Sequence, residues 1–224
     1  MRAAAAVRRR TVTEIARNAG LRWTGGVVLA AAAACVVWVG LARPDGGTEV
    51  DVLVAVVGLV PPLLLTLAYV GGPMTRDLAN GTVAAVLATA VRPRELVRGA
   101  SGAVLEASIP LALAVPVALM LVGGGVPGLP LVLSGLVLTP LSAAGIVTLT
   151  VALALARGVE AALVPAWLLS LVVLMGVPVG ALLDMLDVTG WQYLLLGAVG
   201  AACVWLAAWA TVAGLAPERL VERG

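Results

Sequence analysis

Long apolar stretches alternate with short polar connections along the chain, as is typical of helices that cross a membrane. Each apolar stretch is close to, or longer than, the roughly 20 residues that a spanning helix needs. The stretches cover residues 25–42, 52–72, 99–122, 129–156, 159–183 and 191–214. The pattern predicts an all-α integral membrane protein, in which a single transmembrane domain over residues 1–224 contains six transmembrane helices.

The composition supports this class. Of the 224 residues, 62% are hydrophobic and only 12% are charged, about half the charged fraction of an ordinary soluble domain. The apolar residues are mostly Ala, Val and Leu. Small side chains of this kind allow helices to approach closely in lipid, where packing rather than water exclusion drives association.

The arginines predict how the chain is oriented. Of the 14 basic residues, all arginine, only Arg43 falls on the second side of a six-span arrangement. Loops rich in Lys and Arg remain in the cytoplasm. We therefore expect both termini and the connection 73–98 to be cytoplasmic, in a bacterial plasma membrane. Because topology alone explains the basic N-terminal segment, no nucleic-acid partner is expected.

The segment before the first span, residues 11–23, is predicted to be an interfacial helix. Thr11 and Glu14 have the spacing of a capping box, which marks a helix start. Arg22 and Trp23 then suit the membrane–water boundary. For residues 1–10 we expect a disordered basic tail.

The end of the fifth stretch leaves two interpretations open. Gly176, Pro178 and Gly180 would interrupt a helix. Residues 177–188 fit a short re-entrant or interfacial piece, and they fit equally a plain span followed by a short acidic loop.

Glu106 is the single charged residue well inside a predicted span. It would lie about 11 Å beyond the cytoplasmic boundary, at 1.5 Å per residue. A charged acid facing lipid at the centre of a bilayer costs on the order of 3 kcal/mol, so Glu106 should face protein or a water-filled cleft. Two roles follow: contact with a substrate or proton, or a hydrogen bond to a neighbouring helix through Ser142, Thr148 or Thr150.

Two absences exclude several kinds of site. The chain contains neither His nor Lys. Without Lys it cannot form the G-x-x-x-x-G-K-[ST] loop that cradles nucleotide phosphates. Without His it has no Ser–His or Cys–His nucleophile pair and no His metal site. We expect no catalytic residue, no metal and no cofactor in this chain.

The connection 73–98 is divided by helix stops and starts. Pro73 is predicted to end the second span, and Asn80-Gly81 is a strong stop because Gly takes a left-handed conformation after a helix. Thr82 can cap a short helix over 82–90, and Pro93 begins the third span with Glu95 in its first turn. The apolar middle of the connection is too short to span a bilayer and too apolar to be exposed to water. We expect it to be buried either in the lipid interface or in a groove on a cytoplasmic partner.

This connection, "RDLANGTVAAVLATAVRPRELVRG", resembles the cytoplasmic signature of the ABC type-2 permeases, the membrane subunits of many ATP-binding-cassette exporters. The matching positions, in order, are Asp77, Gly81-Thr82, Leu87, Pro93 and Arg98-Gly99.

The resemblance implies a partner and a mechanism. The chain would pair with a second permease copy or a sister permease, and an ATPase subunit holding the ATP and Mg would dock beneath. Helix 82–90 would be the coupling helix that transmits movement of the ATPase to the spans. The implied ATPase contacts are Asp77, Gly81, Thr82, Val83, Val86, Leu87 and Arg94.

The cargo and the alternatives follow from the same residues. The predicted spans offer few polar groups beyond scattered Ser and Thr, which favours a hydrophobic or amphipathic substrate. A stand-alone secondary carrier or channel is one alternative, although it should have more ionisable sites near the midplane. A membrane assembly or immunity protein without transport activity is the other.

Overall fold

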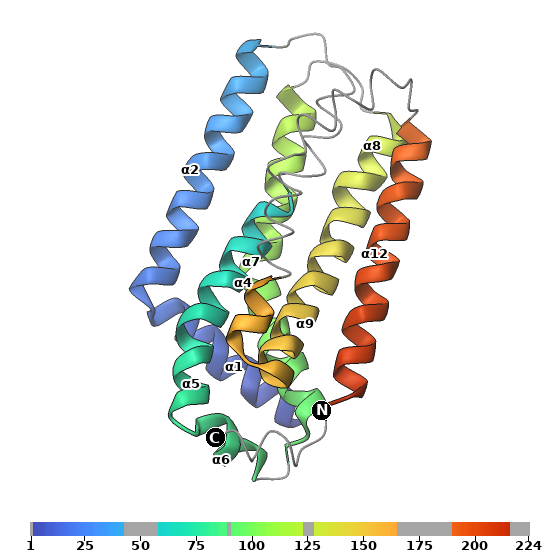
Figure 1. Cartoon of the computed structure of the whole chain (residues 1–224). Coiled ribbons are helices and arrows are strands. Elements are labelled where there is room, and N and C mark those ends of the chain that lie inside the picture. Colours follow the sequence, from blue (N-terminus) through green and yellow to red (C-terminus); the bar gives the residue numbers. More distant parts are fainter. Residues whose placement is uncertain (1, 43–57, 89–90, 123–127, 165–189, 216–224) are drawn as a thin grey trace.

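The computed structural model describes residues 2–42, 58–88, 91–122, 128–164 and 190–215. Every regular element in these ranges is helical (Figure 1). Within the described residues, three helices are long and apolar enough to cross a membrane, namely Pro93–Ala118, Ser134–Arg157 and Gly190–Ala213. The chain is thus a multi-pass membrane protein. The total of six spans stays a prediction, because these helices correspond to the third, fourth and sixth stretches alone.

The helices run alternately up and down the bundle (Figure 1). In chain order they are α1 (Arg2–Arg17), α2 (Ala19–Ala42), α4 (Val60–Tyr69), η1 (Val70–Met74), α5 (Thr75–Ala79), α6 (Thr82–Leu87), α7 (Pro93–Val122), α8 (Leu129–Leu133), η2 (Ser134–Leu138), α9 (Thr139–Arg157) and α12 (Gly190–Ala213). Residues 159–164 are also helical. Helices α1, α5 and α6 gather at one end, where α7 begins and α9 ends.

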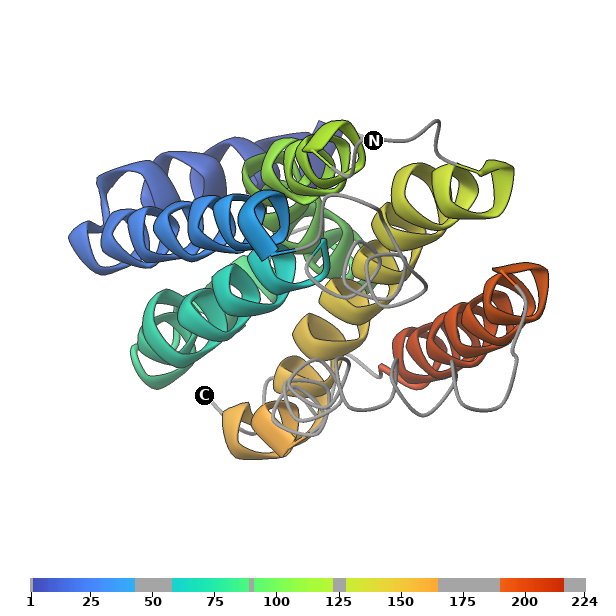
Figure 2. The same ribbon diagram turned by 90° about the horizontal axis from the view of Figure 1, so that it is seen from above.

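The core lies where α4, α7 and α9 meet. Its fully buried side chains include Val70, Val97, Val104, Val147 and Val151. These β-branched residues are compact, so the three helices can pack closely around them. Helix α12 lies at the edge of the bundle against α9 (Figure 2), and it is fixed there by the indole Nε1 of Trp205, which donates to the carbonyl of Leu141 at 3.0 Å.

The N-terminal helix differs from its prediction. Helix α1 begins at Arg2, so residues 2–10 are helical rather than disordered, and Thr11 lies inside the helix instead of capping it. Val7, Thr11 and Ile15 are spaced four apart and face the core, where Thr11 and Ile15 are buried. Packing of this face outweighs the local capping signal, because a Thr hydroxyl can be buried on a helix face as well as exposed at its start.

The predicted interfacial helix over residues 11–23 is divided between two helices. Helix α1 ends at Arg17, and α2 begins at Ala19 after an interruption at Asn18. The Asn18 side-chain oxygen accepts the backbone N–H of Gly20 at 2.9 Å. The chain turns at this elbow from α1 into the long helix α2 (Figure 1).

The second and fourth stretches each contain one wide helical turn. Pro73 does not end its helix, contrary to the prediction, because it lies inside the π-turn η1 that joins α4 to α5. Proline lacks an N–H and its ring clashes in a regular helix, whereas a wider turn accommodates both defects. The hydroxyl of Thr75 then donates to the Val70 carbonyl at 2.7 Å. Helices α8 and α9 are joined in the same way by η2, where Thr139 donates to the Ser134 carbonyl at 2.9 Å.

Candidate functional site

The candidate site is the short helix α6 and the turns on either side of it. Helix α5 ends at Ala79, and the N–H of the next residue, Asn80, donates to the Arg76 carbonyl at 2.9 Å. Gly81 follows with φ 67°, a left-handed conformation that an L side chain would strain. The predicted stop at Asn80-Gly81 is confirmed. It separates α6 from the long helix above it.

The start of α6 differs in detail from its prediction. Gly81 occupies the N-cap position, and Thr82 is the first helical residue and makes no capping bond. Since Gly81 both ends one helix and precedes the next, no residue is left between them for a separate cap. The helix ends at Leu87, and the predicted positions 89–90 lie outside the described residues.

The start of α7 agrees with its prediction. Pro93 is the first residue of the helix and Glu95 lies in its first turn. The Arg92 N–H donates to Glu95 Oε2 at 3.1 Å, which satisfies a backbone donor that the helix itself leaves unpaired. The chain thus leaves the α6 region and enters the third span at a well-defined point.

Helix α6 covers most of its apolar surface with its own chain. Val83 is buried, and Val86 and Leu87 pack half-buried against the core cluster. Ala85 and Ala88 face outward and are exposed. Of the residues implied to contact a partner, Val83 is therefore largely buried. The outer face of α6 is narrow and carries small side chains.

Two cavities border α6 on opposite sides. One, of about 440 Å³, lies toward α1 and is lined by Thr82, Val83 and Val86 among others. The other, of about 470 Å³, lies toward the end of α9 and reaches Val83 and Ala84. Both are clefts that open to the surface rather than enclosed voids. Helix α6 is therefore bordered by open grooves.

Asp77 belongs to an ion pair within the chain. Both of its carboxylate oxygens lie 3.1 Å from Nη2 of Arg10, which projects from α1. The pair sits beside the cavity between α1 and α6. Arg94, by contrast, is exposed at the start of α7. Of the two charged residues implied to contact an ATPase, only Arg94 is thus free of an ion pair within the described ranges.

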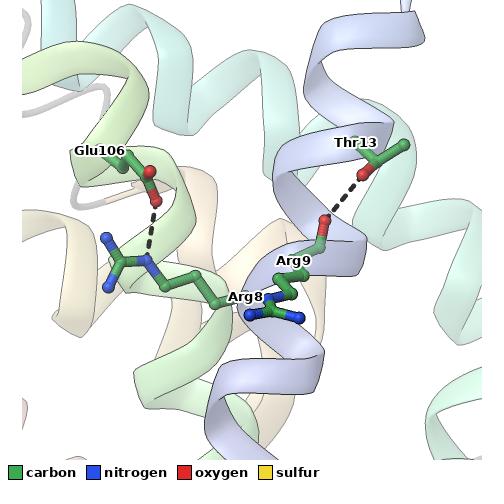
Figure 3. A network of polar contacts seen from close by, with 4 residues as sticks. All are labelled: Arg8, Arg9, Thr13 and Glu106. Atoms are coloured by element: carbon green, nitrogen blue, oxygen red, sulfur yellow. Dashed lines mark hydrogen bonds and ion pairs between the residues drawn. The ribbon is translucent and has the colours of Figure 1, made fainter.

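Glu106 pairs with a residue that the sequence analysis did not select. Arg8 Nε lies 2.7 Å from Glu106 Oε2, and each side chain is about half-exposed (Figure 3). The expected alternatives are not its partners: Thr148 and Thr150 donate to carbonyls of their own helix, Ala144 and Ile146. Glu106 is therefore at the surface between α7 and α1 rather than inside the bundle.

Helix α1 approaches α7 closely at one glycine. A Cβ added to Gly99 would lie 2.7 Å from Cβ of Val7 and 2.9 Å from the Ala4 carbonyl oxygen. Real Cβ atoms do not come so near, so Gly99 is required for this contact. Together with Arg8 and Arg10, it attaches α1 to the helices on both sides of α6. Neither arginine carries a local signal of this role, because the partners lie 98 and 67 residues away along the chain.

Among the described residues no group of three or more Cys, Asp or Glu side chains is placed to hold a metal ion. No protein-family model, curated protein or solved structure matches this chain.

Proposed function

We propose that this chain is the membrane subunit of an ATP-binding-cassette exporter in a bacterial plasma membrane. In this proposal a separate ATPase subunit binds ATP and Mg, and α6 is the coupling helix that it moves. The permease acts as a dimer, either with a second copy of itself or with a sister chain. The chemistry belongs to the ATPase, which agrees with the absence of Lys, and hence of a phosphate-binding loop, from the sequence.

The observation that carries the proposal is the isolation of α6. The left-handed Gly81 separates it from α5, and the next described helix begins at Pro93. Open clefts border α6, while Val83, Val86 and Leu87 hold it against the core. A short helix that is separate from its neighbours yet in contact with the core is suited to pass a push from outside into the bundle.

The charge distribution supports a cytoplasmic position for α6. Every arginine in the described ranges belongs to α1, the first turn of α2, α5, the segment just before α7, the first two turns of α7 or the end of α9. All these elements lie at the end of the bundle that holds α6 (Figure 1). Cytoplasmic segments are enriched in Arg. A cytoplasmic ATPase and cytoplasmic termini are consistent with that arrangement.

The pairing of Glu106 favours an ATP-driven permease over a stand-alone carrier. Ion-coupled carriers place ionisable groups or broken helices at their transport site near the midplane. Here Glu106 is neutralised by Arg8 at the bundle surface. The spans offer chiefly apolar and small side chains, so the proposed cargo is hydrophobic or amphipathic.

Co-purification with a matched pair of variants tests the proposal. Ala85 on α6 and Ala5 on α1 are both exposed helical alanines, so aspartate at either position should leave folding intact. The tagged chain is solubilised mildly from its native membranes, and its vanadate-sensitive ATP hydrolysis is measured. We expect the wild type and Ala5→Asp to retain an ATPase that mass spectrometry identifies by its phosphate-loop sequence. Ala85→Asp should lose it, because an unpaired charge would be buried in the ATPase groove.

Two results would contradict the proposal. One is a wild-type chain that never retains an ATPase under conditions that keep it monodisperse. The other is an Ala85→Asp variant that retains the ATPase as well as Ala5→Asp does.

A further inference from the structure

A third cavity lies at the elbow between α1 and α2, away from α6. Its volume is about 310 Å³, at the lower end of the range for small-ligand sites. The walls come from α1, α2, α4 and α7, and they are apolar except for two residues. The apolar side chains that line it include Ile15, Leu21, Leu65 and Leu111.

Arg22 lines the mouth of this cavity. Its side chain is exposed, and no carboxylate pairs with it within the ranges that the structure describes. The next residue, Trp23, is 77% exposed. Trp and Arg at the end of a membrane helix mark the level of the lipid headgroups. The open end of the cavity therefore presents an unpaired positive charge at headgroup depth.

Ser108 places a buried hydroxyl in the wall of the cavity. It is 1% exposed, and its hydroxyl has no hydrogen-bond partner, although it is among the residues that line the cavity. A buried hydroxyl without a partner is costly, and most such groups in native proteins are satisfied. An acceptor from a bound molecule would remove that cost.

Gly25 keeps one wall open. A Cβ at this position would meet no atom within 4 Å, so the space beside it is empty rather than filled by a neighbouring side chain. Gly25 and Arg22 both line the cavity and lie on the same face of α2, three residues apart. The cavity thus joins a cationic mouth to an apolar interior that contains one free hydroxyl.

We propose that this cavity binds an anionic glycerophospholipid. Arg22 would hold the phosphate, the hydroxyl of Ser108 would donate to an ester carbonyl, and part of an acyl chain would fill the space beside Gly25. Basic pockets between membrane helices on the cytoplasmic side are suited to lipid headgroups in this way. The proposal requires only that the chain is embedded in a membrane. It is therefore tested independently of the proposed ATPase partner.

Native mass spectrometry of the delipidated chain in detergent tests this site. The chain is titrated with phosphatidylglycerol and with phosphatidylcholine of identical acyl chains. We expect phosphatidylglycerol to bind about tenfold more tightly, because both lipids offer a phosphate but only phosphatidylcholine adds a trimethylammonium group, which Arg22 repels. Arg22→Gln should remove that preference. Arg9→Gln, an exposed arginine of α1 without an ion pair in the described residues, should preserve it.

Two further matched pairs separate the acyl and ester contacts from the charge. Gly25→Leu fills the cavity and should abolish tight binding of both lipids, whereas Gly26→Leu, at a neighbouring open position that does not line the cavity, should not. Ser108→Ala should weaken both lipids by about three- to tenfold. Ser134→Ala removes a second buried hydroxyl that has no partner among the described residues and lines none of the three cavities, and it should leave binding unchanged.

The proposal is overturned if the two lipids bind equally to the wild type, or if Gly25→Leu binds as well as Gly26→Leu. Glycerol phosphate provides the last control. If this chainless headgroup binds as tightly as phosphatidylglycerol, the site takes free phosphate compounds and the lipid assignment is wrong.

Discussion

Arg8 and Glu106 join the N-terminal helix to the longest described helix of the bundle, with Nε of the arginine 2.7 Å from Oε2 of the glutamate. The side chains are 52% and 49% exposed. Half-exposed ion pairs contribute about 1 kcal/mol or less to stability. The pair therefore positions α1 and neutralises Glu106 more than it stabilises the fold.

A double-mutant cycle on this pair tests that conclusion. Arg8→Gln and Glu106→Gln should each lower the free energy of unfolding slightly, with a coupling energy of about 0.5–1 kcal/mol. The measurement is chemical unfolding in detergent. Both single variants should affect transport alike. A Glu106→Gln variant that abolishes transport while Arg8→Gln does not would show that the acid acts on substrate or proton directly.

Gly99 should be sensitive to a single methyl group. Gly99→Ala places a Cβ 2.7 Å from Val7, and overpacking of this kind costs about 1–3 kcal/mol. The matched control is Gly102→Ala in the same helix, where the nearest contact, Cδ of Arg8, is an ordinary 3.8 Å. That variant should be neutral or more stable, since Ala is favoured over Gly within a helix by about 1 kcal/mol. Equal thermal stability of the two variants would contradict the close approach of α1 to α7.

Gly81 should tolerate asparagine better than alanine. Its φ of 67° costs an L residue such as Ala about 1–2 kcal/mol, whereas Asn adopts this conformation more readily. We expect Gly81→Ala to lower the unfolding midpoint and Gly81→Asn to lower it less. If alanine stabilises the chain instead, α5 and α6 form one continuous helix and the separation of α6 is wrong.

Trp205 should hold α12 to the rest of the bundle. Loss of its bond to the Leu141 carbonyl in Trp205→Phe should cost about 1 kcal/mol. Trp209 on the same helix is 71% exposed, and Trp209→Phe is the control with little expected effect. Thermal unfolding of the two variants, followed by circular dichroism, distinguishes them. The account of α12 fails if Trp209→Phe is the more damaging change.

The features that the sequence predicts correctly around α6 depend on local chemistry. Gly81 ends a helix because it can adopt positive φ, and Pro93 begins one because it needs no backbone partner there. Both rules act within a few residues. The helical class and the apolar stretches are similarly local properties of composition and length.

The features that were missed depend on distant parts of the chain. Thr11 has the spacing of a cap, but the core that buries it is formed by other helices. Pro73 was predicted to break its helix, yet a π-turn absorbs it. The partners of Glu106 and Asp77 are arginines of the N-terminal segment. That segment, "RAAAAVRRR", is rich in strong helix formers, so its helical propensity could have been recognised although its ion pairs could not.

The most direct test of the proposed function is photocrosslinking from α6 in intact membranes. A benzophenone amino acid is introduced at Ala85, and in a second variant at Ala5, and both are irradiated in native membranes. The account predicts that position 85 crosslinks to an ATPase carrying a phosphate-binding loop and that position 5 does not. Crosslinking of position 85 only to lipid or to the chain itself, in membranes that contain the ATPase, would contradict it.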